Sequence, residues 1–446
     1  MTRSWSVTAR RFWLIGAGLA LLHLGAASGA AWAQEQARPL AIDTGDTAWV
    51  LASSALVLAM IVPGLALFYG GLVRSKNVLG TIMHSFIILS LVSLLWVLVG
   101  YSLAFGPDWH GVIGGLDWIG LSGVGLDPHP TYGPTIPHQA FMVFQMMFAA
   151  ITPALITGAF AERIKFAALL AFTTLWSLLV YAPVAHWLWG GGWLAKLGAL
   201  DFAGGVVVHI TSGMAALVCA YVLGARHGYG TDYLAPHSLP LTLLGTGLLW
   251  FGWFGFNGGS ALGANQVAVT AFVATHAGAV AGAASWLLVE WIHRKTPTVL
   301  GIASGAVAGL ATVTPGAGYV SPFSAVIIGL LAGAASYAAV MWKGKFGYDD
   351  SLDVVGIHGV GGVLGVLATG LLASKSVNPG GADGLFFGNA AFLGYQFAAV
   401  VAVSAFSLAA TYGILKFVDR FVGLRVSREE EMLGLDLSQH NERAYS

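Results

Sequence analysis

Charged residues are scarce in this sequence, and their scarcity excludes an ordinary water-soluble protein. Asp, Glu, Lys and Arg make up 9% of the 446 residues, whereas soluble domains carry about 25%. Hydrophobic residues make up 57%, so a lipid bilayer is the remaining solvent. The formal net charge is zero, which argues against nucleic acid or any strongly charged surface as the main partner.

Cysteine is almost absent, and patterns typical of metal or catalytic sites are missing. Cys219 is the single cysteine, so no intrachain disulfide is possible. His209 and His358 lie in apolar runs with no carboxylate or thiol at ligand spacing, so we expect no metal and no other cofactor. No HExxH motif occurs, and Ala261 follows Ser260 where a rhomboid-like GxSG needs glycine. We therefore expect a protein that is not an enzyme.

The N-terminus resembles a secretory signal. Arg3, Arg10 and Arg11 precede an apolar stretch over residues 12–30. Ala31-Trp32-Ala33 then has the small-x-small pattern of a cleavage site. Cleavage after Ala33 would leave residue 34 outside the membrane, and the alternative is an uncleaved first helix. We expect a signal peptide over residues 1–33 and a location in the inner membrane of a cell with a periplasm.

Eleven apolar stretches follow, each near the ~20 residues that a bilayer core requires. They lie near residues 47–73, 83–105, 139–160, 166–188, 201–224, 239–257, 265–292, 298–314, 321–342, 353–373 and 391–418. The 61 glycines suit close helix packing in a membrane, and Gly301, Gly305 and Gly309 form one small-xxx-small stripe. The sequence therefore predicts an all-α membrane protein with eleven transmembrane helices.

The basic residues predict the topology. If the mature chain begins outside, most lysines and arginines fall in cytoplasmic loops or at the cytoplasmic end, and only Arg38, Lys196 and Lys375 lie outside. The predicted orientation is N-out and C-in. We expect a transmembrane domain over residues 34–420 and a polar cytoplasmic regulatory tail over residues 421–446.

Two matched pairs of residues suggest an internal repeat. Asp201 precedes His209 by eight residues, and Asp350 precedes His358 by the same spacing. The two segments open the fifth and the tenth predicted spans, so each half contains an odd number of helices and the segments run in opposite directions. This indicates a five-plus-five inverted repeat with a narrow central pore. Histidines inside apolar helices are functional candidates, although each also fits a neutral, hydrogen-bonded core residue. Asp201 fits either a helix cap or a carboxylate that attracts a cation.

Aromatic residues recur at helical spacing. Phe144 and Phe148 share one face, and Trp253, Phe256 and Ser260 share another. Tyr181 and Trp189 do so at a spacing of eight. Such faces are usually core packing, but aromatic rings with a hydroxyl also bind small cations.

The sequence resembles the bacterial Amt branch of the ammonium transporter (Amt/Mep/Rh) superfamily over nearly the whole mature chain. The matching stretches are YGGLVRSKN (69–77), TGAFAERIKF (157–166), AHWLWGGGWL (185–194), LDFAGGVVVHI (200–210), FGWFGFNGGS (251–260), DVVGIHGVGG (353–362) and the tail from residue 423. Val206 departs from the family, which often has a small hydroxyl residue there.

The resemblance implies a role for each candidate residue. Phe148, Trp189 and Ser260 would bind ammonium or methylammonium at an outer site shaped by Asp201. Phe148 and Phe256 would form a gate, and the pore would be lined by His209, His358, Trp253, Phe144 and Tyr181. The family further implies a homotrimer in membrane lipid, and a PII-type signalling protein as a partner at the cytoplasmic face.

Three alternatives to an ammonium transporter remain open at this point. A neutral-gas channel of the Rh type shares the histidine pair but does not need the cation site of Trp189 and Ser260. An intramembrane hydrolase would use Ser260, against the missing motifs. A sensor would bind ammonium and act through its tail, although the sequence carries no signalling domain.

Overall fold

The computed structural model describes residues 40–445, so the expected signal peptide lies outside the described residues. In this part of the chain, eleven helices are long and apolar enough to cross a membrane. The expectation of eleven spans is confirmed. The second span is longer than the sequence predicts, because it begins at Ser75 and runs to Phe105.

Several spans are built from more than one helical segment, and η denotes a short π or 3-10 segment. The first five spans comprise α2 (Thr44–Ala59), η2 (Met60–Leu65) and α3 (Ala66–Leu72); η3 (Ser75–Asn77), α4 (Val78–Leu95), η4 (Trp96–Gly100) and α5 (Tyr101–Phe105); α6 (His138–Phe160); α7 (Phe166–Trp176), η6 (Ser177–Tyr181), α8 (Ala182–Leu188) and α9 (Trp193–Leu197); and η7 (Gly205–Ile210) with α10 (Thr211–Leu223).

The remaining six spans are α11 (Leu239–Gly259); α12 (Gln266–Arg294); α13 (Val299–Val313) with η8 (Thr314–Gly316); α14 (Pro322–Trp342) with η9 (Lys343–Phe346); η10 (Val355–Val360) with α15 (Gly361–Leu372); and α16 (Ala390–Phe421). Two short helices, α17 (Arg428–Leu433) and α18 (Leu435–His440), form the tail.

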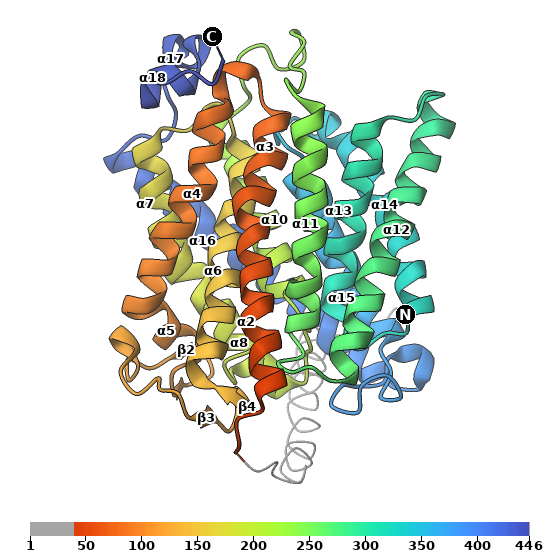
Figure 1. The fold of residues 1–446 in the computed structure, drawn as a ribbon. Coiled ribbons are helices and arrows are strands. Elements are labelled where there is room, and N and C mark those ends of the chain that lie inside the picture. Colours follow the sequence, from red (N-terminus) through yellow and green to blue (C-terminus); the bar gives the residue numbers. More distant parts are fainter. Residues whose placement is uncertain (1–39, 446) are drawn as a thin grey trace, which may run out of the picture. The chain divides into compact units, whose positions relative to one another are not determined.

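Two short antiparallel pairs of strands lie in the loop between α5 and α6. They are β1 (Asp108–Trp109) with β2 (Ile113–Gly114), and β3 (Pro128–His129) with β4 (Gly133–Pro137). In Figure 1 these strands lie at the end of the bundle where α2 begins, and α17 and α18 lie at the other end. We call these the hairpin end and the tail end.

Glycine allows the closest helix contacts. A Cβ atom built on Gly282 of α12 would lie 2.5 Å from the carbonyl oxygen of Gly305 and 2.8 Å from Cα of Gly309, both in α13. No side chain fits there, so the predicted glycine stripe is a packing surface between α12 and α13. In contrast, α6 is buried along almost its whole length, and it supplies the centre of the bundle.

Candidate functional site

The two histidines lie in matching local structures. His209 belongs to η7 and His358 to η10, and both are π segments of six residues. A π segment widens the helix by one residue and is frequent at functional sites. The inverted repeat predicts this likeness, because each half supplies one histidine in the same setting.

The two imidazole rings are in direct contact. Their Nδ1 atoms are 3.1 Å apart, and the rings stack at 5.1 Å with an angle of 17° between them. Both side chains are buried, and Nε2 of His209 has no hydrogen-bond partner among the described residues. The structure therefore unites two residues that are 149 positions apart in the sequence.

This contact fixes the chemistry of the outward-facing ring nitrogens. A hydrogen bond between two Nδ1 atoms requires one ring to carry the proton there and the other to lack it. Because a neutral imidazole carries one proton, the donating ring has a bare Nε2 and the accepting ring has an Nε2–H. The pair thus offers one acceptor and one donor, and they exchange roles when the shared proton moves.

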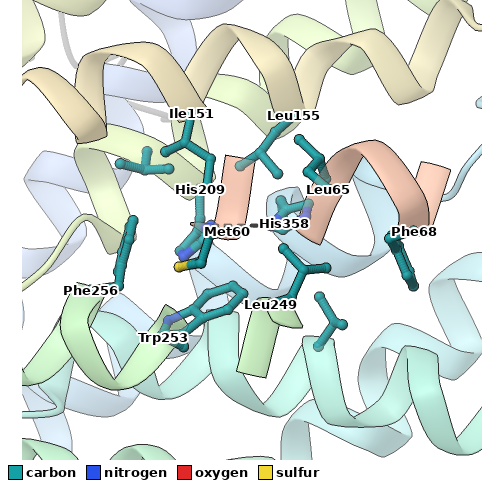
Figure 2. A pocket seen from close by; sticks show the side chains of 12 residues that line it. Met60, Leu65, Phe68, Ile151, Leu155, His209, Leu249, Trp253, Phe256 and His358 are labelled. Carbon is teal, nitrogen blue, oxygen red and sulfur yellow. Dashed lines mark hydrogen bonds between the residues drawn. The ribbon is translucent and has the colours of Figure 1, made fainter. Parts of the chain in front are cut away.

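An apolar cavity surrounds the pair (Figure 2). Besides the two histidines it is lined by Met60, Leu65, Phe68, Ile151, Leu155, Val208, Leu249, Trp253, Phe256 and Val307. Met60 and Leu65 come from η2, where Pro63 and the extended backbone of Val62 interrupt the helix. An ion cannot lose its hydration water in such surroundings without a large free-energy cost. The two histidines supply the polar groups that a molecule in this cavity can bind.

Aromatic rings continue from the histidines toward the hairpin end. Phe256 lies 6.2 Å from His209 and stacks on Phe148 at 4.3 Å, and Phe148 meets Trp189 edge-on at 5.8 Å. Phe144 contacts Phe148 at 5.0 Å. The hydroxyl of Ser260 donates to the carbonyl oxygen of Phe256 at 2.8 Å, so its oxygen can still accept a hydrogen bond.

A polar network behind the cavity was not anticipated from the sequence. Trp253 stacks on His209 at 5.6 Å and donates through Nε1 to the hydroxyl of Thr314 at 2.9 Å. Thr314 donates to Asn257 at 3.3 Å, and Asn257 donates to Thr275 at 2.8 Å. These bonds hold the indole ring in place. Asn257, a polar residue inside an otherwise apolar span, is the sequence feature that could have predicted this network.

Asp201 is bound by backbone amides. One carboxylate oxygen accepts from the N–H groups of Gly204 and Gly205, and the other accepts from Val206 and Val207, at 2.6–2.9 Å. The capping role is thus confirmed, and Val206 contributes its backbone rather than a hydroxyl. The carbonyl oxygen of Asp201 also accepts from Nε1 of Trp189 at 2.8 Å, which joins the cap to the aromatic cluster.

Tyr181 is the predicted pore residue that lies apart from the ring stack. Its aromatic neighbour is Trp96, at 6.1 Å, and in the part of the chain that the structure describes its buried hydroxyl has no hydrogen-bond partner. The other nine candidates form a continuous group around the histidines, the stacked phenylalanines and the Asp201 cap. The sequence placed Tyr181 and Trp189 on one helix face, but their aromatic neighbours differ, and the spacing gave no contacts between helices.

The tail end contains a buried ion-pair network that the sequence did not predict. Arg74 binds Glu162 through Nε at 2.9 Å, and Arg226 binds Asp349 through Nε and Nη2 at 2.8 and 2.9 Å. Arg226 also lies 3.5 Å from Glu162. Burial favours the neutral acids, but Arg226 and Arg74 hold the pKa of Glu162 below its usual value, and Arg226 does the same for Asp349.

The tail packs against this end through buried polar contacts. Asp436 accepts from the backbone N–H of Gly80 at 2.8 Å, and Glu431 binds Arg425 at 2.7 Å and the N–H of His227 at 2.7 Å. The side chain of Lys76 donates to the carbonyl oxygens of Glu431 and Met432. The tail therefore docks onto η3, the start of α4 and the loop between α10 and α11, on the side that the predicted topology places in the cytoplasm.

The comparisons with known proteins agree on one family. The sequence profile of the Ammonium Transporter Family matches residues 48–445. An ammonium transporter of Bacillus subtilis is 56% identical over 402 residues, covering 90% of this chain and 98% of the relative. Ammonium transporter Amt1 of Archaeoglobus fulgidus is 52% identical over 403 residues, covering 90% and 99%.

Solved structures give the same result. The crystal structure of Mep2 from Candida albicans is similar with a TM-score of 0.83 and 39% identity, and the match covers 91% of each chain. A structure described as a sensor Amt protein has a TM-score of 0.81 at 30% identity and covers 89% of this chain and 98% of its own.

Proposed function

The chain belongs to the ammonium transporter family, and we propose that it carries ammonium across the membrane through the cavity around His209 and His358. One observation carries this proposal. Two imidazoles in contact lie in an apolar cavity, in line with the stacked rings of Phe148 and Phe256. Such a column favours a small molecule that can lose a proton, make hydrogen bonds and pass as a neutral species.

Ammonium and methylammonium bind first at the hairpin end, between Phe148, Trp189 and Ser260. The two ring faces attract a cation, and the hydroxyl oxygen of Ser260 accepts one N–H. The ionised carboxylate of Asp201 adds a favourable field. Because water and these groups both solvate the ion here, this is the last position at which the charged species is stable.

Beyond the stacked phenylalanines the substrate moves as ammonia. Its nitrogen accepts from an Nε2–H of the histidine pair, and its own N–H donates to the bare Nε2. The proton travels separately through the shared Nδ1–Nδ1 contact, so that no ammonium ion enters the dry segment. This transport changes no covalent bond other than those to protons, so we propose transport rather than catalysis.

An ammonium concentration jump applied to purified protein in liposomes tests the proposal. We expect a transient current together with a change in internal pH, since both ammonia and a proton cross. A pH change without any current would instead identify a neutral-gas channel of the Rh type. Absence of both signals from correctly folded protein would contradict transport altogether.

The working unit is a homotrimer in the inner membrane, reached through a signal peptide over residues 1–33. His276 supports the subunit contact, because it is exposed on the single chain although it lies well inside the 29-residue helix α12. A polar ring is costly against lipid tails, so a second copy covers this face, which also exposes Phe251 and Phe272. Light scattering of the detergent-solubilised protein measures the number of subunits.

Residues 34–420 form the transport domain, and residues 421–446 regulate it from the cytoplasm. Glu431 accepts from the N–H of His227 in the loop between α10 and α11, and Asp436 accepts from the N–H of Gly80 in α4. These contacts support this role, since a partner that displaces the tail would break them. A PII-type signalling protein is the partner that the family implies. Ammonium sensing through this tail is the second candidate function, supported by the likeness to a sensor Amt protein.

A further inference from the structure

Asp350 occupies the place in the second half that Asp201 occupies in the first. Each aspartate is buried and lies eight residues before a histidine of the central pair. The two residues lie at opposite ends of the pore, since the repeat is inverted. If the two aspartates had the same role, we would expect their carboxylates to have the same hydrogen bonding.

The hydrogen bonding differs. Both oxygens of Asp201 accept from backbone N–H groups, four in all, and these donors favour the ionised form although burial raises its pKa. Asp350 accepts at Oδ2 from the N–H of Val355 at 2.7 Å, but its Oδ1 is buried and has no hydrogen-bond partner within residues 40–445. A buried carboxylate oxygen without a donor is unfavourable while it is ionised, and binding a proton removes that penalty.

A nearby lysine does not satisfy that oxygen. Lys343 donates to the backbone carbonyl of Asp350 at 2.7 Å and pairs with the carboxylate of Asp353. The charge of Lys343 is therefore shared between two acids. Burial raises the pKa of Asp350 to about 6 even though Lys343 opposes the shift. The other titratable groups whose charge is coupled to Asp350 are Tyr69, Arg163, Cys219 and Tyr348.

The segment that follows Asp350 packs behind the wall of the cavity, and the charge of Asp350 acts on Tyr69 in that layer. Phe68 and Leu155 line the cavity, and Tyr69, the next residue after Phe68, donates its hydroxyl to the carbonyl oxygen of Leu155 at 2.9 Å. At Gly158 an added Cβ would lie 2.8 Å from the Tyr69 ring and 2.6 Å from Val354. The segment that leads from Asp350 to His358 thus packs against the same tyrosine.

We propose that Asp350 is the carboxyl group that takes up the transported proton on the tail side of the histidine pair and releases it to water. This inference rests on the proposed function. The proton leaves ammonium at the hairpin end, passes along the imidazoles and forms an O–H bond at Oδ1 of Asp350. Water at the tail end then removes it, which restores the carboxylate, and ammonia that has crossed the pore recombines with a proton outside the dry segment.

Ammonium-jump currents in proteoliposomes between pH 5 and pH 7 test the role, with an internal pH dye as the second readout. The ionised fraction of an acid with a pKa of about 6 falls from about 90% at pH 7 to about 10% at pH 5. We therefore expect the wild-type current to fall about ninefold over this range. The Asp350→Asn variant keeps an acceptor for the Val355 N–H, but it should carry at most a tenth of the current, without pH dependence.

The controls separate a proton acceptor from a structural residue. In Asp350→Asn the dye should still report ammonia entry, and Asp350→Glu should restore the current. Asp419→Asn is a matched control, because Asp419 is an exposed acid that also accepts one backbone N–H, from Leu424 at 3.1 Å. The current of this variant should equal that of the wild type.

A wild-type current and pH profile in Asp350→Asn would overturn the inference, and so would equal loss of current and ammonia entry. A wild-type protein without current would instead refute the proposed function itself, before any variant is compared.

Discussion

The pore and the Arg226 network at the tail end both bury polar groups, but they differ in whether these groups have hydrogen-bond partners. Around His209 the cavity is apolar, and the ring keeps an unpartnered Nε2. At the tail end, Arg226 sits between Asp349 and Glu162, and each acid oxygen that it meets is paired. Saturated polar groups fix a structure, whereas an open polar atom in a dry cavity is available to a passing molecule. The following experiments test whether this contrast separates function from stability.

The largest effect is expected from replacing both histidines by leucine. His209→Leu/His358→Leu removes the donor and the acceptor of the cavity, so the ammonium-driven current should fall to the background of empty liposomes. The helices lose the hydrogen bond between these two rings, and leucine still fills the apolar space, so membrane insertion and subunit assembly should remain. Current recording beside a pH dye measures the outcome.

A histidine outside the cavity provides the control. His293 bonds the hydroxyl of Tyr337 at 2.7 Å near the end of α12, and His293→Leu should leave the current unchanged. A wild-type current in the double leucine variant would mean that the pair is only a packed core element.

Arg226→Ala should damage stability rather than transport chemistry. The substitution leaves the buried Asp349 without its main partner and Glu162 with Arg74 alone, which costs about 3–5 kcal/mol of the free energy of unfolding. The apparent melting temperature in detergent measures the loss. Arg294 is exposed and lies 3.8 Å from Glu290, which also accepts from Thr298, so Arg294→Ala should change stability by less than about 1 kcal/mol.

Acid should reduce the difference in the free energy of unfolding between Arg226→Ala and the wild type. The pKa values of Glu162 and Asp349 lie below their usual values in the folded protein, so the folded state binds protons less tightly than the unfolded state. Their stabilisation is present above a pH of about 4 and is lost as the pH falls through the lowered values. A difference that does not depend on pH would show that Arg226 acts through packing alone.

The Trp189→Leu substitution should have an intermediate effect at the hairpin end of the pore. Loss of one cation–π partner costs about 1–2 kcal/mol, which raises the half-saturating ammonium concentration about 5- to 30-fold. The maximal current should change less, because the histidine pair is intact. Trp109 is exposed, and Trp109→Leu should not alter half-saturation. Equal half-saturation in wild type and Trp189→Leu would exclude the site.

Deleting the chain after Phe421 should have the smallest effect on the pore. Helix α16 ends at that residue, and the transmembrane contacts remain without α17 and α18. We expect an inserted, folded protein with altered regulation of its current. The deletion also exposes the Arg226 network, so the melting temperature should fall by less than in Arg226→Ala. A truncated protein that cannot insert would contradict a purely regulatory tail.

Much of the fold follows from the sequence because a bilayer leaves few choices. A spanning segment must satisfy its own backbone hydrogen bonds, so runs of about 20 apolar residues predict helices. The predicted span over residues 83–105 missed the beginning of its helix at Ser75, since Lys76 and Asn77 interrupt the apolar run there. The tail shows the same limit, because buried acids such as Glu431 and Asp436 look solvent-exposed in a polar segment.

The sequence by itself determined the helices, the faces that carry Phe148, Phe256 and the two histidines, and the matched spacing of the two aspartates. Local periodicity suffices for these features, because residues on one helix face are related by the 3.6-residue turn alone. Only the tertiary structure decided that the histidines touch through their Nδ1 atoms, that Asp201 is saturated, and that Asp350 keeps an open oxygen. Those outcomes depend on how helices far apart in the chain pack, and spacing within one segment contains no information about that packing.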